Sequence, residues 1–205
     1  MKGTRLASGV LVAAMIAIPP TVKAAAGVDG AGSVGTCATT GKIGLKPALV
    51  GFPNPDTSPP DTVKVQTKNP KNVVCTGTRT GDGANVVSAS SKGGGTTPHS
   101  SCSALAGTTS STLTLTVKWK TVKGTPKLNP STITTTSQTG GVSGDGMHGT
   151  FDITGTVTAG SFTGDSVTAH VETDQLLSDV LAACNGKGIK KISFGANGAS
   201  SVTIN

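Results

Sequence analysis

Strict alternation of apolar and polar residues marks the clearest element of this chain. In the stretch TLTLTVKWK, residues 112–120, apolar residues occupy every odd position and threonine or lysine every even one. A period of two places successive side chains on opposite faces of a β-strand. The pattern therefore predicts a half-buried strand over 112–120. Its inner face carries Leu113, Leu115, Val117 and Trp119.

The same period recurs, less regularly, along much of the chain. It predicts a strand over 42–49, in which Pro47 lacks an amide donor and so favours a sheet edge or a bulge. Shorter strands are expected over 62–67, 85–90 and 131–137. Each of these segments is expected to be one strand of an antiparallel β domain.

A hairpin is predicted over 150–171, with Ala159 and Gly160 in its turn. Phe151, Ile153 and Val157 share a face in the first strand, but Phe162 has the opposite parity to Val167. We expect a bulge at Gly164-Asp165 to restore the phase, since glycine within a strand commonly marks one. That bulge would turn Phe162 inward.

The C-terminal part predicts one helix and a second hairpin. Leucine and cysteine recur at helical spacing over 175–184, with Asp174 placed to cap the start and Asn185-Gly186 to end the helix. Strands over 188–194 and 200–204 surround Asn197-Gly198, a dipeptide typical of hairpin turns.

Low-complexity segments lie at 53–60 and 91–98, and both are predicted to be loops. The second, SKGGGTTP, lacks the Gly-Lys-Ser or Gly-Lys-Thr of a phosphate-binding loop. Together these elements predict an all-β fold: a single antiparallel β-barrel or β-sandwich of about nine or ten strands, with one short helix near the C-terminus. The succession of short hairpins favours the barrel.

The N-terminus has the layout of a secretory signal. A basic start is followed by 13 apolar or small residues over 6–18 and then by Ala24 and Ala26, either of which offers a cleavage site. The apolar run is shorter than the roughly 20 residues that a spanning helix needs. We predict a signal peptide over 1–26, a flexible segment over 27–36 and a β domain over 37–205. The expected location is secreted, extracellular or the cell envelope, with no transmembrane span in the mature chain.

Charge and aromatic content narrow the range of partners. Removing Lys2, Arg5 and Lys23 with the signal leaves 14 basic against 10 acidic residues, so the net charge falls from +7 for the full sequence to +4. Aromatic residues make up 2% of the chain, and tyrosine is absent. Because single-stranded nucleic acid is held by aromatic stacking and basic stripes, we expect no nucleic-acid partner. Attraction to an anionic envelope polymer or lipid stays open.

The four cysteines predict two disulfides. Cys37, Cys75, Cys102 and Cys184 are widely spaced in a chain expected to be exported, which favours covalent pairing over zinc binding. If the strands near residues 48 and 62 face each other, antiparallel partners sum to about 110, which brings Cys75 within two residues of the position opposite Cys37. This register favours Cys37–Cys75 with Cys102–Cys184. The alternative, Cys75–Cys102 with Cys37–Cys184, stays open.

Candidate chemistry concentrates near the motif GDGMHGTFD. The residues concerned are Asp145, His148, Asp152, Asp165 and His170. Paired carboxylates can perform acid and base catalysis, as in glycoside hydrolysis. Asp145 and Asp165 nevertheless lie in glycine-rich turns, where aspartate is a common structural residue. We therefore predict no catalytic, metal or cofactor site.

Lysines form two groups, at 118–127 and 187–191. The first contains Lys118, Lys120, Lys123 and Lys127, and the second Lys187, Lys190 and Lys191. Such lysines commonly solvate an outer face and protect sheet edges. The alternative is contact with an anionic wall polymer or a lipid head group.

The order of motifs resembles that of small secreted β-rich actinobacterial proteins with four cysteines. The resemblance rests on Cys-x-x-x-Gly-Lys-Ile at 37–43, Cys-Thr-Gly at 75–77, Ser-Cys-Ser-Ala-Leu at 101–105 and GTVTAGSFTG at 155–164. It covers most of the mature chain and implies the fold, but it assigns no functional residue.

Three functions are compatible with these observations. The first is a non-enzymatic secreted or envelope-associated β domain that binds a partner or has a structural role. The second is a carrier of a small apolar ligand, lined by Leu113, Leu115, Val117 and Trp119. The third is a secreted hydrolase that uses paired aspartates among Asp145, Asp152 and Asp165.

Overall fold

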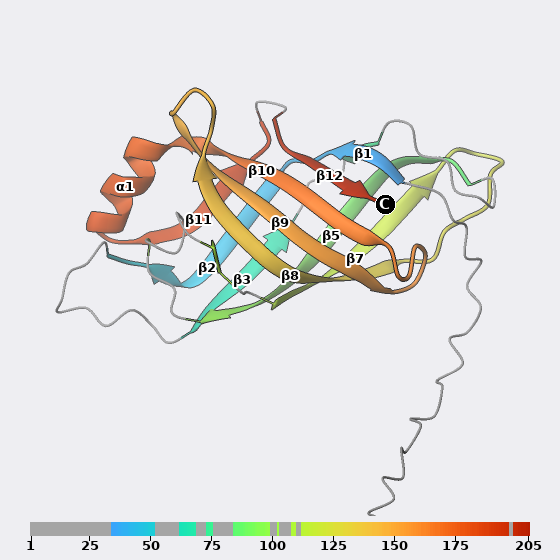
Figure 1. The fold of residues 1–205 in the computed structure, drawn as a ribbon, viewed down its shortest axis with the longest axis horizontal. Helices are drawn as coiled ribbons and strands as arrows, with labels where there is room; N and C mark the ends of the chain where they lie inside the picture. The colour runs from blue at the N-terminus through green and yellow to red at the C-terminus, as the bar shows by residue number, and fades with distance from the viewer. Residues whose placement is uncertain are drawn as a thin grey trace, which may run out of the picture.

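The computed structural model describes residues 34–51, 62–68, 73–75, 84–98, 102, 108–109, 112–196 and 199–205. These residues form one antiparallel sheet of twelve strands and one helix (Figure 1). The first six strands are β1 (Val34–Ala38), β2 (Gly41–Leu49), β3 (Thr62–Lys68), β4 (Val73–Val74), β5 (Val86–Pro98) and β6 (Thr108–Thr109). The others are β7 (Thr112–Thr121), β8 (Ser131–Val142), β9 (His148–Ala159), β10 (Ser166–Leu176), β11 (Ile189–Phe194) and β12 (Ser201–Ile204); the helix is α1 (Leu177–Asn185). The predicted signal peptide and the 53–60 loop lie outside the described residues.

The sheet curls on itself, as Figure 1 shows, so that β8, β9 and β10 cross in front of β2, β3, β5 and β7. Pairing runs from β2 through β3, β5, β7, β8, β9, β10 and β11 and returns to β2. These eight strands form a ring, and its weakest step is β10–β11, where only Thr173 pairs with Phe194. The all-β prediction is confirmed, and the barrel form agrees better with this ring than two stacked sheets would.

The predicted C-terminal hairpin is wrong. β11 and β12 do not pair with each other; both lie along the same edge of β10, one after the other. On their other side β11 pairs with β2 and β12 with β1. The two strands therefore act as one interrupted strand, and both run in the same direction beside β10.

β1 begins at Val34, within the segment that we expected to be flexible. It pairs along its length with β12, which orders the chain three residues before Cys37. At β2, the pairs with β3 end at Lys46, and the register with β11 shifts between Gly44 and Leu49. Pro47 lies within that irregular stretch, as its missing donor predicts.

The predicted loop at 91–98 is also wrong, because these residues continue β5. A side chain at Gly93 would place its Cβ 2.1 Å from the carbonyl oxygen of Thr114, and one at Gly95 2.2 Å from that of Thr112. The glycines thus allow β5 to approach β7 more closely than any other residue would. In a barrel, such glycines permit a sharp bend of the sheet.

The β9–β10 hairpin forms, but its turn is longer than predicted. Val157 bonds to Gly164 and Asp165, and Phe162 lies in the turn with a left-handed φ of 67°. Gly164 and Asp165 both oppose the single residue Val157, and Gly164 has a left-handed φ of 98°, so the expected bulge is present. The burial of the Phe162 ring is also as predicted.

The helix lies close to its predicted range. Asp174 does not cap it: its Oδ1 accepts the Ala196 amide at 2.8 Å, and the N-cap residue Leu176 makes no side-chain bond. The Leu177 amide instead donates to the Met147 carbonyl at 2.7 Å. Gly186 ends the helix, as predicted.

Two apolar clusters fill the described interior. The helix-end cluster consists of Leu45, Leu49, Cys102, Leu113, Phe151, Val171, Cys184, Ile189, Ile192 and Phe194. The turn-end cluster consists of Cys37, Cys75, Val86, Val117, Ile133, Val157, Phe162, Val167 and Ile204. Both reach along β9, where Phe151 belongs to the first and Val157 to the second.

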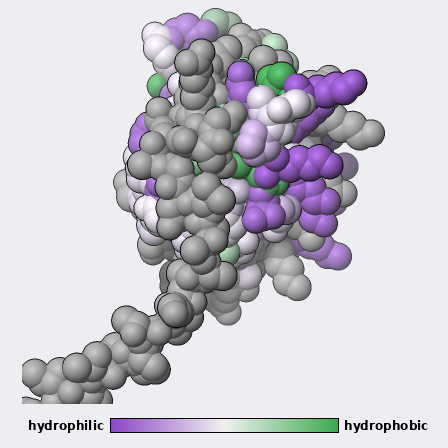
Figure 2. Space-filling view, turned by 90° about the vertical axis from the view of Figure 1, so that its right-hand side faces the viewer, coloured by the Kyte–Doolittle hydropathy of each residue, from purple (hydrophilic) through white to green (hydrophobic). Residues whose placement is uncertain are grey.

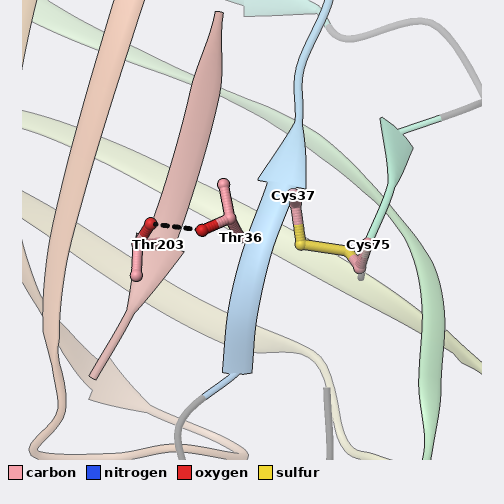
Figure 3. The surroundings of a disulfide bond; sticks show 4 residues. All are labelled: Thr36, Cys37, Cys75 and Thr203. Atoms are coloured by element: carbon pink, nitrogen blue, oxygen red, sulfur yellow. Dashed lines mark hydrogen bonds between the residues drawn. A yellow bond between two sulfur atoms is a disulfide. The ribbon is translucent and has the colours of Figure 1, made fainter. Parts of the chain in front are cut away.

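Each cluster contains one disulfide, and the favoured pairing is confirmed. Cys37 of β1 is joined to Cys75 beside β4, next to the Thr36–Thr203 hydroxyl contact of 3.3 Å (Figure 3). The β2–β3 pairs do sum to 110, as in Lys42 with Lys68, and the cysteine bridge is slipped from that register by two. The helix-end disulfide, Cys102–Cys184, fixes the C-terminal turn of α1 to the barrel end.

Candidate functional site

Lysines lie on five neighbouring strands, β11, β2, β3, β5 and β7. Seven have exposed side chains: Lys42, Lys46, Lys92, Lys118, Lys120, Lys190 and Lys191. β3 carries Lys64 and Lys68 at the register positions paired with Lys46 and Lys42. We call these nine residues the lysine face.

The register aligns several of these lysines directly across the sheet. Lys68 is the partner of both Lys42 and Lys92, which makes a row across β2, β3 and β5. Lys46 pairs with Lys64 four residues further along β2. Neighbouring strands lie about 4.8 Å apart, so this spacing concentrates positive charge. Like charges directly opposite each other destabilise a sheet, and such rows therefore have a folding cost.

No carboxylate offsets this charge on the same strands. The sequences of β2, β3, β5, β7 and β11 contain no Asp or Glu. The opposite flank has the reverse composition: β8, β9 and β10 contain no Lys or Arg but carry Asp152, Glu172 and Asp174. The barrel is thus polarised around its circumference, not along its axis.

Figure 2 shows strongly hydrophilic side chains standing out from one flank, on the right of that view. The turn between the two views places this flank at the back of Figure 1, where β2, β3, β5 and β7 run behind β8, β9 and β10. The picture agrees with the exposure of the lysines on these strands.

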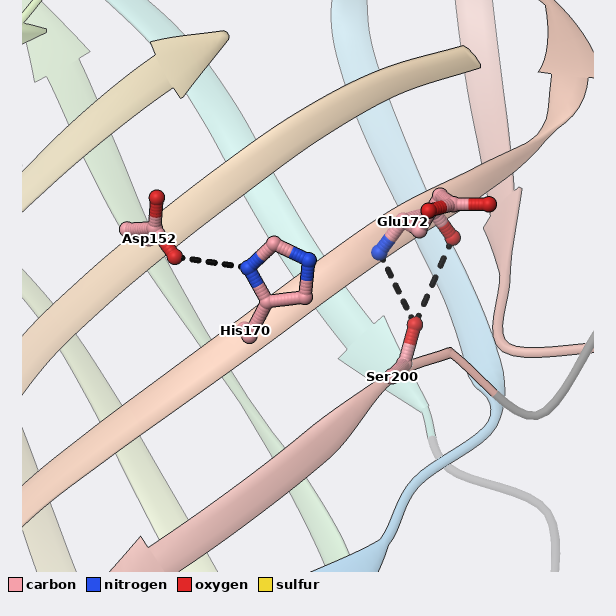
Figure 4. A network of polar contacts seen from close by, with 4 residues as sticks. All are labelled: Asp152, His170, Glu172 and Ser200. Carbon is pink, nitrogen blue, oxygen red and sulfur yellow. Dashed lines mark hydrogen bonds and ion pairs between the residues drawn. The ribbon is translucent and has the colours of Figure 1, made fainter. Parts of the chain in front are cut away.

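The ion pair found among the described residues lies on the opposite flank. His170 Nδ1 and Asp152 Oδ1 are 2.7 Å apart on neighbouring strands (Figure 4). In the same view, Ser200 Oγ accepts the Glu172 amide at 2.9 Å and contacts the Glu172 carbonyl at 3.4 Å. The Ser200 hydroxyl, which is buried, is therefore engaged by the main chain. It fixes the point where β12 begins beside β10.

The three carboxylates of the hydrolase hypothesis lie in separate places. Asp145 is in the turn before β9, Asp152 is within β9 and Asp165 is in the turn after it. β9 has twelve residues, so its two ends are roughly 35 Å apart at the usual rise per residue. Paired catalytic carboxylates stand about 5–10 Å apart. The structure thus does not bring Asp145 and Asp165 together.

Asp145 has a structural role in its turn. It accepts hydrogen bonds from the Ser143 hydroxyl and from the Met147 amide, the latter at 2.9 Å. These two hydrogen bonds lower the pKa of the Asp145 carboxyl below its usual range, and the bond from Ser143 has the larger effect. His148, the first residue of β9, contacts the Gln175 carbonyl through Nδ1 at 3.3 Å. Asp145 thus stabilises the turn before β9, and His148 links the start of β9 to the end of β10.

The four residues suggested as a ligand lining belong to the packed interior. Leu113 is in the helix-end cluster and Val117 in the turn-end cluster, with Leu115 and Trp119 packed against the latter. Trp119 Nε1 donates to Ser131 Oγ at 2.8 Å, and its ring meets Phe162 edge-on at 5.1 Å. The shared face of these residues agrees with the alternation in the sequence.

The described residues contain no group of three or more His, Cys, Asp or Glu side chains able to hold a metal ion. In the same part of the chain, no helix is both long and apolar enough to cross a membrane. No protein-family model, curated protein or solved structure matches the chain.

Sequence reasoning found only part of the lysine face. Lys118, Lys120, Lys190 and Lys191 belong to it, whereas Lys123, Lys127 and Lys187 lie outside the strands. The lysines of β2, β3 and β5 were missed because they are isolated in the sequence. A signal was present for part of the set: Lys42, Lys46 and Lys64 alternate with apolar residues in the strands expected over 42–49 and 62–67. Lys92 lies in the segment that we predicted as a loop, so no such signal marked it.

Proposed function

We propose that this protein is exported and acts as a non-enzymatic binding domain whose lysine face holds an anionic component of the cell envelope. The polarity of charge supports this proposal most directly. Nine lysines and no carboxylate occupy five adjacent strands. A surface that served only solubility would be expected to intersperse both signs.

Two further features support the proposal. Two disulfides favour an oxidising compartment, where reducing agents do not break such bonds. The carboxylates that could form a catalytic pair are separated along β9, and the interior is occupied by packed side chains. A binding role for the outer surface therefore agrees better with the geometry than catalysis or transport of an apolar ligand.

The test is equilibrium binding of the oxidised protein, purified from an exporting host, to two anionic probes in 0.15 M salt. One probe is a 16-residue polyglutamate, and the other is a vesicle of equal parts phosphatidylglycerol and phosphatidylcholine. The face variant K42Q/K92Q/K118Q is compared with the control K123Q/K127Q/K187Q, which loses the same charge outside the five strands.

The proposal predicts binding to at least one probe. Each lysine near an anionic surface contributes about 1 kcal/mol, so the face variant should bind at least ~10-fold more weakly. The control should stay within about threefold of the parent. Absence of binding to both probes, or equal losses in the two variants, would reject the lysine face as the binding surface.

A further inference from the structure

The lysine face extends around the barrel rather than along it. From β11 to β7 the pairing takes four of the eight steps of the ring, through β2, β3 and β5. Four of eight equal steps are about half a turn of a closed sheet. Lys191 on β11 and Lys118 on β7 therefore face in nearly opposite directions, with Lys42 and Lys92 between them.

A flat surface cannot contact lysines on opposite sides of a convex barrel. A bilayer touching β3 would lie beyond the reach of β11 and β7, because interactions in physiological salt decay over about 8 Å. Membrane-binding surfaces also commonly insert apolar side chains. Among the exposed large apolar residues of the described chain, only Val87 lies on these five strands.

A flexible chain of negative charges can follow the curvature and meet all the lysines in turn. We infer that the lysine face binds a linear, flexible polyanion that wraps around the barrel across β11, β2, β3, β5 and β7. This inference rests on the proposed function and deepens it by naming the class of ligand. The residues between the lysines on β5 and β7 are mainly Thr, Ser and Gly. Recognition of the polyanion therefore depends on its charge and on its ability to follow the lysines around the barrel, not on a binding pocket.

The required length of the polymer follows from the ring. Eight strands spaced about 4.8 Å apart and tilted by about 40° form a ring of roughly 8 Å radius, and the lysine side chains extend it further. Half the circumference at the ammonium groups is on the order of 40 Å. An extended peptide covers at most about 3.5 Å per residue, so four glutamates reach roughly 14 Å and sixteen roughly 56 Å.

The experiment compares polyglutamates of 4 and 16 residues at equal carboxylate concentration, with the oxidised full protein. The 16-residue chain should bind at least ~10-fold more tightly per carboxylate, since it alone spans the face. The variants K190Q/K191Q and K118Q/K120Q remove one end of the path each. Each should weaken the 16-residue chain about 10-fold, whereas the control K123Q/K127Q should have little effect.

The phosphatidylglycerol vesicle distinguishes wrapping from surface docking. If vesicles bind and the 16-residue chain does not, wrapping is wrong while the proposed function stands. If neither binds, both are wrong. Equal affinity per carboxylate for the two chain lengths, or binding of the long chain that neither end variant weakens, would also overturn wrapping.

Discussion

Replacement of Lys92 by Glu should stabilise the fold while weakening polyanion binding. Lys92 is exposed on β5 and lies directly opposite Lys68 of β3. On its other side it pairs with Thr116 of β7, so Lys118, two residues further along, is a diagonal neighbour. Charge reversal converts one direct and one diagonal repulsion into attractions.

The magnitude follows from the register. A directly opposed charge pair is worth about 0.2–1 kcal/mol in either direction, and the diagonal pair contributes less because its side chains are about 7–8 Å apart. Exposure to solvent keeps both values near the lower end. The expected gain is about 0.5–1.5 kcal/mol. At about 2–4 °C per kcal/mol for a domain of this size, Tm should rise by roughly 1–6 °C.

The assay is thermal unfolding of the oxidised protein followed by circular dichroism in 20 mM and in 1 M salt. The matched control is Lys92→Gln, which removes the repulsion without adding an attraction and should give about half the gain. In 1 M salt the screening length is only about 3 Å, so the gain should largely disappear. Binding of the 16-residue polyglutamate should weaken in both variants, and more in Lys92→Glu.

A Lys92→Glu protein no more stable than its parent in 20 mM salt would refute the reasoning about cross-strand repulsion. So would a gain of equal size in 1 M salt, because that would indicate packing or propensity rather than charge. Retained polyanion affinity would count against Lys92 as part of the binding path.

Three other predictions concern the fold itself. Double alanine substitution of the helix-end disulfide, which closes a sequence separation of 82 residues, should cost about 2–4 kcal/mol in urea unfolding. Phe162→Ala should cost about 3–4 kcal/mol through the cavity it leaves, and the emission of Trp119 should shift to longer wavelength, since its ring loses the edge contact. Gly93→Ala should destabilise by about 1–3 kcal/mol because its Cβ would lie 2.1 Å from a backbone oxygen, whereas Gly144→Ala, with nothing within 4 Å, should be neutral.

Local alternation was sufficient to predict most strands and the disulfide pairing. The 112–120 pattern matches β7, and the register deduced for the strands on either side of 53–60 matches the β2–β3 pairs. Both inferences work because a period of two determines the inward face, and an antiparallel register determines which residues meet.

The errors arose where long-range pairing overrides a local signal. Asn197-Gly198 is a strong hairpin signal, yet β11 and β12 each gain more pairs beside β10, β2 and β1 than they would from each other. The run of glycines at 93–95 resembles a connector, but it belongs to β5, and the absence of side chains at Gly93 and Gly95 lets this strand pack close to β7. Neither condition can be read from the neighbouring residues.

The lysine rows link folding to binding. Like charges at the paired positions of Lys42, Lys68 and Lys92 are expected to lower the stability of the free protein, and a polyanion on the same strands should offset that repulsion. A ligand that binds only the folded state stabilises it by RT ln(1 + [L]/Kd), which is about 2.7 kcal/mol at 100 times Kd. Because the lysines are brought together only when the ring of strands forms, the unfolded chain offers a more diffuse charge to the polymer. A polyanion should therefore raise Tm most at low salt and in the protein that keeps all the paired lysines. The lysine arrangement that destabilises the free protein is then the same one that binds the ligand.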